Sequence, residues 1–143
     1  MDQIKNTPEL VWVFISTEGC LGRCPIFSMR ITSTGYARME DHLLFDPIPR
    51  FEFSKTRIRE KDFKRLKFTI EKAELFSFKQ DNSFFVSCIP VYNLKVKFKG
   101  HRVISISENA KCSGKKVAAI FNCFLNLRLS QDWKLISSLI SSY

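Results

Sequence analysis

The sequence has no apolar run close to the roughly 20 residues that a membrane-spanning helix needs. Its first eight residues are polar. The apolar stretch that follows, residues 10–15, is too short for the core of a signal peptide and has no basic segment before it. We therefore expect a protein that stays in the cytoplasm and has no membrane partner.

Recognisable catalytic motifs are also missing. The chain has only two histidines, His42 and His101, and it contains no P-loop, GxGxxG, HExxH or GxSxG pattern and no distinctive pair of carboxylates. A catalytic Cys–His pair stays possible, because such partners lie far apart in sequence. The sequence therefore favours a non-enzymatic protein, and a cysteine-dependent enzyme is kept as the third hypothesis.

The cysteines lack the spacing of a metal or redox site. There are five, an odd number in a chain long enough to fold without disulfides, so reduced thiols are expected. Cys20 and Cys24 are one residue too far apart for a redox CxxC motif, and no second pair supplies further zinc ligands. We expect no metal and no cofactor, and we interpret the two thiols as a loop motif or a disulfide.

Negative charge is scarce after residue 50. The whole chain has 23 Lys and Arg against 14 Asp and Glu, a net charge of +9. Residues 1–50 hold five basic and six acidic residues, whereas residues 51–143 hold eighteen and eight. A positive charge confined in this way favours an acidic partner, although net charge can also serve solubility alone.

Short stretches with the periodicity of β-strands are abundant. Residues 10–15 are continuously apolar, which predicts a strand buried on both faces. Alternating polar and apolar residues predict further strands at 27–32, from 36, and at 51–55, 92–99 and 102–107. Most of these strands are joined by tight turns, so they are expected to pair as hairpins.

The apolar spacing becomes helical in two places. One stripe consists of Phe63, Leu66, Ile70 and Ala73, and its helix has no good N-cap residue. The other consists of Val117, Ile120, Phe121, Phe124 and Leu125, with Ser113 as the candidate N-cap. A short last helix is expected from about Asp132, with its apolar residues packed on the body: Leu135, Ile136, Leu139 and Ile140.

Strands in hairpins, rather than strands alternating with helices, are typical of the α+β class. We predict a single domain over residues 1–143. It should contain an antiparallel sheet of about five to six strands, two main helices on one face and a short C-terminal helix. The fourteen phenylalanines supply the large buried side chains that such a core needs.

One loop carries a resemblance to a known family. The residues Gly19-Cys20-Leu21-Gly22-Arg23-Cys24-Pro25 lie between two predicted strands. This arrangement resembles a bacterial family of unknown function whose members open with a strand, a Gly-Cys-x-Gly-x-Cys-Pro loop and a second strand. The resemblance extends over residues 10–133 and supports the fold. Many relatives look like exported lipoproteins, whereas this chain has no leader, and the resemblance implies no activity and no catalytic residue.

Basic residues form two clusters. The first begins with Lys55 and includes Lys64 and Arg65, and the second contains Lys95, Lys97, Lys99 and Arg102. The lysines of the second cluster alternate along a strand, so they share one face of the sheet. Lysines on an outer strand can serve only to prevent aggregation between sheets. They can also form a positive surface for an acidic protein or for a phosphate backbone.

We interpret the basic surface as a binding site. The first hypothesis is a protein that acts on an acidic protein partner, of the inhibitor, immunity or counter-defence type, with the residues of both clusters named above as contacts. The alternative is a nucleic-acid-binding protein that uses the same face. Nucleic-acid-binding proteins usually interleave exposed aromatic residues or contain a known module, and the sequence shows neither, so nucleic acid is the second hypothesis.

Overall fold

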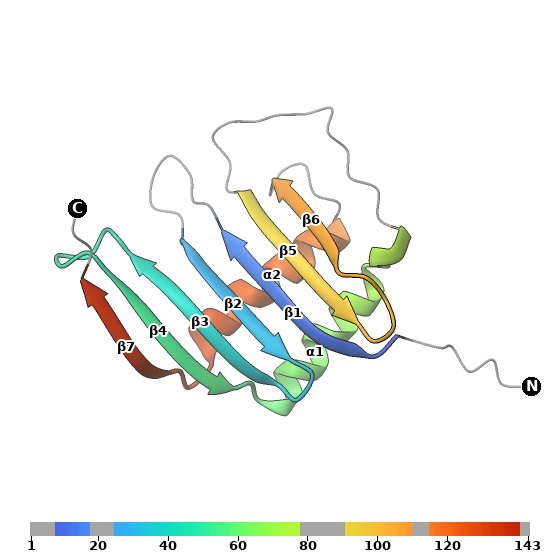
Figure 1. The fold of residues 1–143 in the computed structure, drawn as a ribbon, viewed down its shortest axis with the longest axis horizontal. Coiled ribbons are helices and arrows are strands. Elements are labelled where there is room, and N and C mark those ends of the chain that lie inside the picture. Colours follow the sequence, from blue (N-terminus) through green and yellow to red (C-terminus); the bar gives the residue numbers. More distant parts are fainter. Residues whose placement is uncertain (1–7, 18–24, 78–90, 110–114, 141–143) are drawn as a thin grey trace, which may run out of the picture.

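The computed structural model describes residues 8–17, 25–77, 91–109 and 115–140. They form a seven-stranded antiparallel sheet, two α-helices and a short 3-10 helix (Figure 1). The elements in chain order are β1 (Leu10–Thr17), β2 (Phe27–Thr32), β3 (Tyr36–Leu43), β4 (Arg50–Arg57), α1 (Glu60–Lys72), η1 (Leu75–Ser77), β5 (Val91–Phe98), β6 (Ile104–Asn109), α2 (Lys115–Ser130) and β7 (Lys134–Ile140).

The first strand of the chain lies inside the sheet. The strand order is β6-β5-β1-β2-β3-β4-β7, and every neighbouring pair is antiparallel. On one side of β1, Ile15 lies opposite Met29 of β2, and on its other side Ile15 lies opposite Leu94 of β5. β1 therefore joins the pair β5 and β6 to the four strands on its other side.

The predicted sheet of five to six strands with a short C-terminal helix is wrong. The sheet has seven strands, because the segment predicted as the last helix is the strand β7, which pairs with β4. The apolar residues of this segment are spaced i, i+1, i+4 and i+5, which also fits one side of a helix. The segment forms a strand because it pairs with β4, about 80 residues earlier in the sequence. A pairing over such a distance cannot be predicted from the local sequence pattern.

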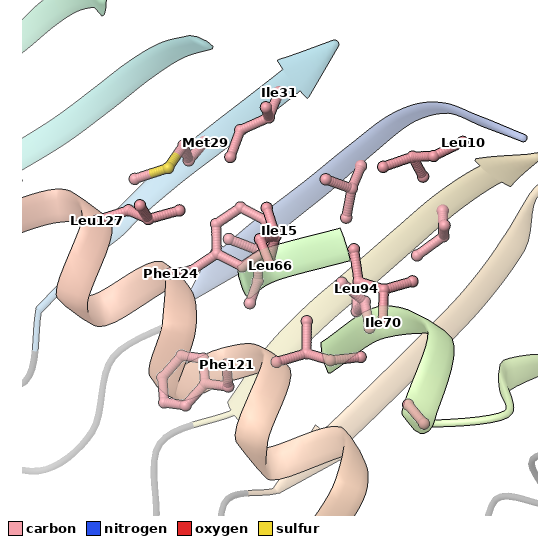
Figure 2. Close-up of a cluster of buried hydrophobic side chains, with 14 of the residues drawn as sticks. Leu10, Ile15, Met29, Ile31, Leu66, Ile70, Leu94, Phe121, Phe124 and Leu127 are labelled. Atoms are coloured by element: carbon pink, nitrogen blue, oxygen red, sulfur yellow. The ribbon is translucent and has the colours of Figure 1, made fainter. Parts of the chain in front are cut away.

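Both helices cover the same face of the sheet, and they lie behind it in the view of Figure 1. Side chains from α1, α2 and the strands β1, β2 and β5 converge between the two layers, as Figure 2 shows. Leu66 of α1, Phe124 of α2 and Ile15 of β1 are completely buried there. The core of the described residues therefore lies on one side of the sheet only.

We call the other side of the sheet the open face. In the strands β1 to β6, the residues between the buried ones have their side chains on this face, and the register with β4 places Lys134 of β7 there as well. The positions used below are Trp12, Phe14, Ser28, Arg30, Arg38, Glu40, Phe53, Lys55, Lys95, Lys97, Ser105 and Lys134. The prediction that residues 10–15 are buried on both faces is thus wrong, since Trp12 and Phe14 are only half-buried.

The start of α1 is capped from a distant part of the chain. Arg59 occupies the N-cap position and its side chain makes no capping hydrogen bond, as the sequence indicated. Gln131 accepts a hydrogen bond from the backbone N–H of Arg59 at 2.9 Å and donates one to Asp62 at 2.8 Å. The buried Gln131 side chain thereby ties the first turn of α1 to the end of α2. The predicted N-cap of α2, Ser113, lies outside the described residues.

The turn between β2 and β3 depends on Gly35. This residue has φ of 83°, and a Cβ atom added to it would lie 3.3 Å from Cδ2 of Phe63 on α1. Gly35→Ala is therefore expected to lower the free energy of unfolding by about 2 kcal/mol, from the left-handed backbone and the tight contact together. Denaturant titration followed by circular dichroism measures it.

The matched control is Gly100→Ala in the turn between β5 and β6. Gly100 has φ of 78°, and an added Cβ would meet nothing within 4 Å. Only the strain of the left-handed backbone applies there, so the free energy of unfolding is expected to fall by about 1 kcal/mol. Equal losses at the two glycines would show that contact with Phe63 does not limit the position of Gly35.

Candidate functional site

A row of residues that lie opposite one another in successive strands crosses the open face, and most of its side chains are basic. Following the register from strand to strand, the row consists of Ser105, Lys95, Phe14, Arg30, Arg38, Lys55 and Lys134. It includes one residue from each of the seven strands. Five of them are cations, and all five are exposed. We call these five residues the cation row.

The cation row is not neutralised by carboxylates. Among the described residues, none of its five members forms an ion pair with Asp or Glu. Arg38 lies directly between Arg30 and Lys55, and Lys55 lies opposite Lys134. Like charges directly opposite one another destabilise a sheet by a few tenths of a kcal/mol per exposed pair. The row therefore costs stability unless an anion binds to it.

Arg50, also on β4, shows the opposite arrangement. Its guanidinium lies 3.1 Å from a carboxylate oxygen of Glu52 and 3.1 Å from one of Asp46. The hydrogen bond with Glu52, followed by the weaker effect of Asp46, raises the pKa of Arg50 above its ordinary value. Arg50 is thus already paired within the chain, which distinguishes it from Arg38 and Lys55.

Aromatic side chains lie between the cations. Phe14 is a member of the same cross-strand level, between Lys95 and Arg30, and Trp12 lies opposite Lys97 on the next level of the open face. The guanidinium carbon of Arg30 is 4.9 Å from the centre of the Trp12 ring, a cation–π contact. Both rings are half-buried, so part of each is accessible to a ligand.

The centre of the open face is hollowed. A cavity of about 330 Å³ lies there, lined by Phe14 and Phe53, by Arg30 and Arg38 of the cation row, and by Glu40 and Ile136. Glu40 lies 3.4 Å from the Nε2 atom of His42, and within the described part of the chain it is the one carboxylate on the open-face strand positions named above. The hollow combines aromatic walls with two guanidinium groups that have no carboxylate partner among the described residues.

The residues predicted from the second basic cluster are partly brought together. Lys95 and Lys97 lie on the open face, as their alternation predicted. Lys99 and Arg102 lie in the connection between β5 and β6, beyond the end of the strand. Lys99 is 3.9 Å from Glu9, and the Nζ atom of Lys97 donates a hydrogen bond to the carbonyl of His101. Of these four residues only Lys95 belongs to the cation row.

The two residues predicted from the first cluster, Lys64 and Arg65, lie elsewhere. Both are exposed on α1, in the helical layer behind the sheet, and Lys64 forms a 3.1 Å ion pair with Glu60. A ligand lying flat on the open face would therefore not contact them. The predicted binding residues do not form one surface, and the structure divides them between the two sides of the sheet.

Reasoning from the sequence missed most of the cation row. Arg30, Arg38 and Lys134 were not singled out, because each is an isolated cation in its own segment and no cluster appears along the chain. Their alternation with buried residues was the available signal, but it gives only the face of each strand. The interpretation of Lys95 and Lys97 as edge protection is wrong, since β5 lies between β6 and β1.

The histidines and the described cysteine do not form a catalytic pair. His42 contacts Phe51 and Glu40, and His101 lies against Phe76. Cys123 donates a hydrogen bond to the Thr69 hydroxyl at 3.5 Å. Cys20 and Cys24 lie outside the described residues. In the ranges that are described, no group of three or more potential metal ligands comes together.

Comparison with known proteins identifies the family but no activity. None of the helices described here is both long and apolar enough to cross a bilayer. No curated protein matches the sequence significantly. A family model described as a domain of unknown function, DUF6438, matches residues 12–128, from β1 to near the end of α2. These residues carry four of the five members of the cation row, and only Lys134 lies beyond them. This protein belongs to the DUF6438 family.

Proposed function

We propose that this protein is a non-enzymatic binding protein that holds single-stranded nucleic acid on its open face. One observation carries the proposal: five exposed cations lie side by side across the sheet without a carboxylate partner among the described residues. A row of like charges is costly in the free protein and favourable when a polyanion covers it. Phosphate groups supply that negative charge at regular intervals.

The aromatic residues favour a nucleic acid over other polyanions. Trp12, Phe14 and Phe53 present ring surfaces beside the cations, and unpaired bases stack on such rings with little sequence preference. The central hollow, about 330 Å³, is large enough for one base, with Arg30 and Arg38 at its rim for the neighbouring phosphates. In a duplex the bases are stacked and paired, so the rings of the open face cannot stack on them, and the single strand is the better fit.

The length of the cation row fits a short segment of a strand. From β5 to β7 the row crosses five strand spacings, which amounts to about 24 Å. Single-stranded binding sites on other small sheet domains hold about four nucleotides or more. A strand running across the sheet, roughly perpendicular to the β-strands, would contact all five cations in succession.

An acidic protein is the second candidate for the same face. Ile136 is half exposed at the rim of the hollow, and an aliphatic residue there suits an apolar anchor of a protein partner better than a base. In this version the protein is an inhibitor or immunity-type protein. Lys95, Lys97 and the other cations of the open face would increase the rate of association by electrostatic attraction.

The proposal also concerns the cellular location of the protein and the redox state of Cys20 and Cys24. A nucleic-acid-binding role fits a cytoplasmic location with Cys20 and Cys24 reduced. The export that the resemblance described above implies for relatives would instead fit a protein in which the two thiols are oxidised. Alkylation of the native protein followed by mass measurement distinguishes the two states, because a disulfide protects both cysteines from the reagent.

Fluorescence anisotropy with labelled oligonucleotides tests the proposed function. We expect a single-stranded 12-mer to bind, with log K falling linearly against log[salt] at a slope of about −2 to −3.5, as three to five phosphate contacts require. The same sequence as a duplex should bind more weakly. Polyglutamate, an acidic polymer without rings, serves as the control for charge alone.

The outcomes separate the two candidates. Weaker binding of polyglutamate than of the single strand at equal charge supports nucleic acid, because only the bases can use the aromatic residues. Equal binding of both would leave the aromatic residues without a role and would favour the acidic protein. Absence of binding to the single strand in low salt would rule out the nucleic-acid proposal.

A further inference from the structure

The last strand of the sheet presents large aliphatic side chains to solvent. All seven residues of β7 are exposed. Leu135 and Leu139 are each 58% exposed, Ile136 is 50% exposed and Ile140 is 76% exposed. A single exposed aliphatic residue is ordinary, but four within six positions form a continuous apolar strip, which is typical of an interaction surface.

β7 is also an edge of the sheet. It pairs with β4 on one side, and no strand of the described residues pairs with its other side. Proteins usually protect such edges with charged residues or proline, and the segment from Leu135 to Ile140 contains neither. The opposite edge, β6, differs: its Ile106 is buried under the helices, and Ser105 and Ser107 are the exposed residues.

We propose that β7 pairs antiparallel with β7 of a second copy of this chain, forming a two-fold symmetric dimer with one continuous sheet. The two-fold axis of such a pair passes midway between a residue and its own symmetry mate. Ser137 and Ser138, at the middle of β7, are the two positions on which the pairing can be centred. The register irregularity between β4 and β7 makes the aliphatic residues of β7 point to both sides of the sheet. Either register lays Leu135, Ile136, Leu139 and Ile140 of the two copies along one interface.

The absence of charge along most of β7 permits a second copy to pair with this strand. Each chain carries a net charge of +9, so repulsion between two copies is weakest where charge is absent. The only charged residue of β7 is Lys134 at its start, so the two copies of Lys134 lie at opposite ends of the paired strands. An acidic strand would gain no partner charges along Leu135–Ile140, whereas an identical strand gains the aliphatic contacts and the backbone hydrogen bonds.

The dimer does not depend on the proposed function, but it would extend the same surface. The two-fold axis of an antiparallel strand pair is perpendicular to the sheet, so it keeps both open faces on one side. Lys134 ends the cation row of one copy beside the interface. A dimer would therefore present ten row cations on a single side of one continuous sheet.

Sedimentation of the full chain under reducing conditions tests the dimer. We expect a monomer–dimer equilibrium in the micromolar range. The double variant Ile136→Lys with Leu139→Lys places two charges on the strand of each copy, and its Kd should rise about 100-fold or more. The control, Val103→Lys with Phe68→Lys, adds the same charge at exposed apolar positions away from β7 and should leave Kd within about threefold.

A gain-of-signal measurement covers the case in which the lysine variant fails to fold. Residues opposite one another in antiparallel strands have Cα atoms about 4.5–5.5 Å apart, which is within reach of a disulfide. Ser137→Cys or Ser138→Cys, whichever faces its own symmetry mate, should form a disulfide between two copies on mild oxidation, located by mass spectrometry. Ser105→Cys on β6 should not. A wild-type monomer at about 100 µM, or no link at either position, would overturn the proposal.

Discussion

Reversal of the two central cations, by Arg30→Glu together with Arg38→Glu, is expected to weaken binding of a single-stranded oligonucleotide by about 100-fold or more. The two side chains lie opposite each other at the rim of the hollow, where each would contact a phosphate. The reversal removes both contacts and adds repulsion. The salt slope should become shallower by about 1.4, since each phosphate contact contributes about 0.7 for a single strand. Anisotropy at several salt concentrations measures both quantities.

The stability of this double variant separates a binding role from a structural one. Both arginines are exposed, and neither is paired with a carboxylate among the described residues. A glutamate at position 38 would face Lys55, which offsets the repulsion between the two new glutamates, so the melting temperature should change little. Lower affinity together with a lower melting temperature would indicate that the arginines support the fold instead.

The matched control makes the same charge change on the other side of the sheet. Lys64→Glu with Arg65→Glu alters two exposed cations of α1, which were predicted as contacts from the sequence. Because they lie behind the sheet, we expect only the effect of net charge, less than about threefold in affinity. A large loss in this control would show that the helical layer, and not the open face, binds the ligand.

Asp41→Ala is expected to lower the free energy of unfolding by about 3 kcal/mol, because it breaks a largely buried ion pair. Asp41 lies on the helix side of β3, where both its oxygens are 3.1 Å from Nη2 of Arg128 on α2. The side chains are 13% and 18% exposed respectively. Removal of the carboxylate leaves a guanidinium largely out of water, beside the ring of Phe27 and with an Nε atom that already has no partner.

Two further variants define the cause of that loss. Replacement of both partners, Asp41→Leu with Arg128→Met, removes the unpaired charge and should recover most of the stability. Glu60→Ala, which breaks the exposed ion pair with Lys64 on α1, should cost less than about 1 kcal/mol. Denaturant unfolding of the three variants provides the comparison. An Asp41→Ala loss as small as that of Glu60→Ala would mean that Arg128 reaches water when it is unpaired.

Local periodicity predicted those parts of the fold in which one face is buried. The stripe of Phe63, Leu66 and Ile70 identified α1, since an amphipathic helix has an unambiguous period. The alternation in β5 placed Leu94 inward and Lys95 outward for the same reason. In both cases the buried residues of one element suffice to determine its orientation against the core.

Two segments could not be interpreted from local pattern. Residues 10–15 are apolar at every position, so the run looks buried on both sides, although Trp12 and Phe14 lie on the open face. The apolar residues of β7 are exposed on both sides of the strand, so they show no strand periodicity. Such residues deviate from the pattern because they do not belong to the core, and here they lie in or beside the proposed interaction surfaces.

The site itself required the register between strands. The cation row draws its members from five strands, and Arg30, Arg38 and Lys134 are separated in the chain by 7 and 95 residues. A shift of one residue in any pairing would move a cation to the buried face and break the row. The sequence showed an excess of positive charge, whereas only the paired strands show where that charge gathers.

The internal position of β1 has a consequence for synthesis of the chain. Residues 10–17 leave the ribosome before the other strands described here, and the hairpins of β2, β3 and β4 can form soon after them. The second partner, β5, ends only at residue 98, so until then one edge of β1 and the apolar side chains of Val13 and Ile15 lack their final cover. A nascent chain stalled in this interval would expose an unpaired strand, and chaperone binding should be concentrated there.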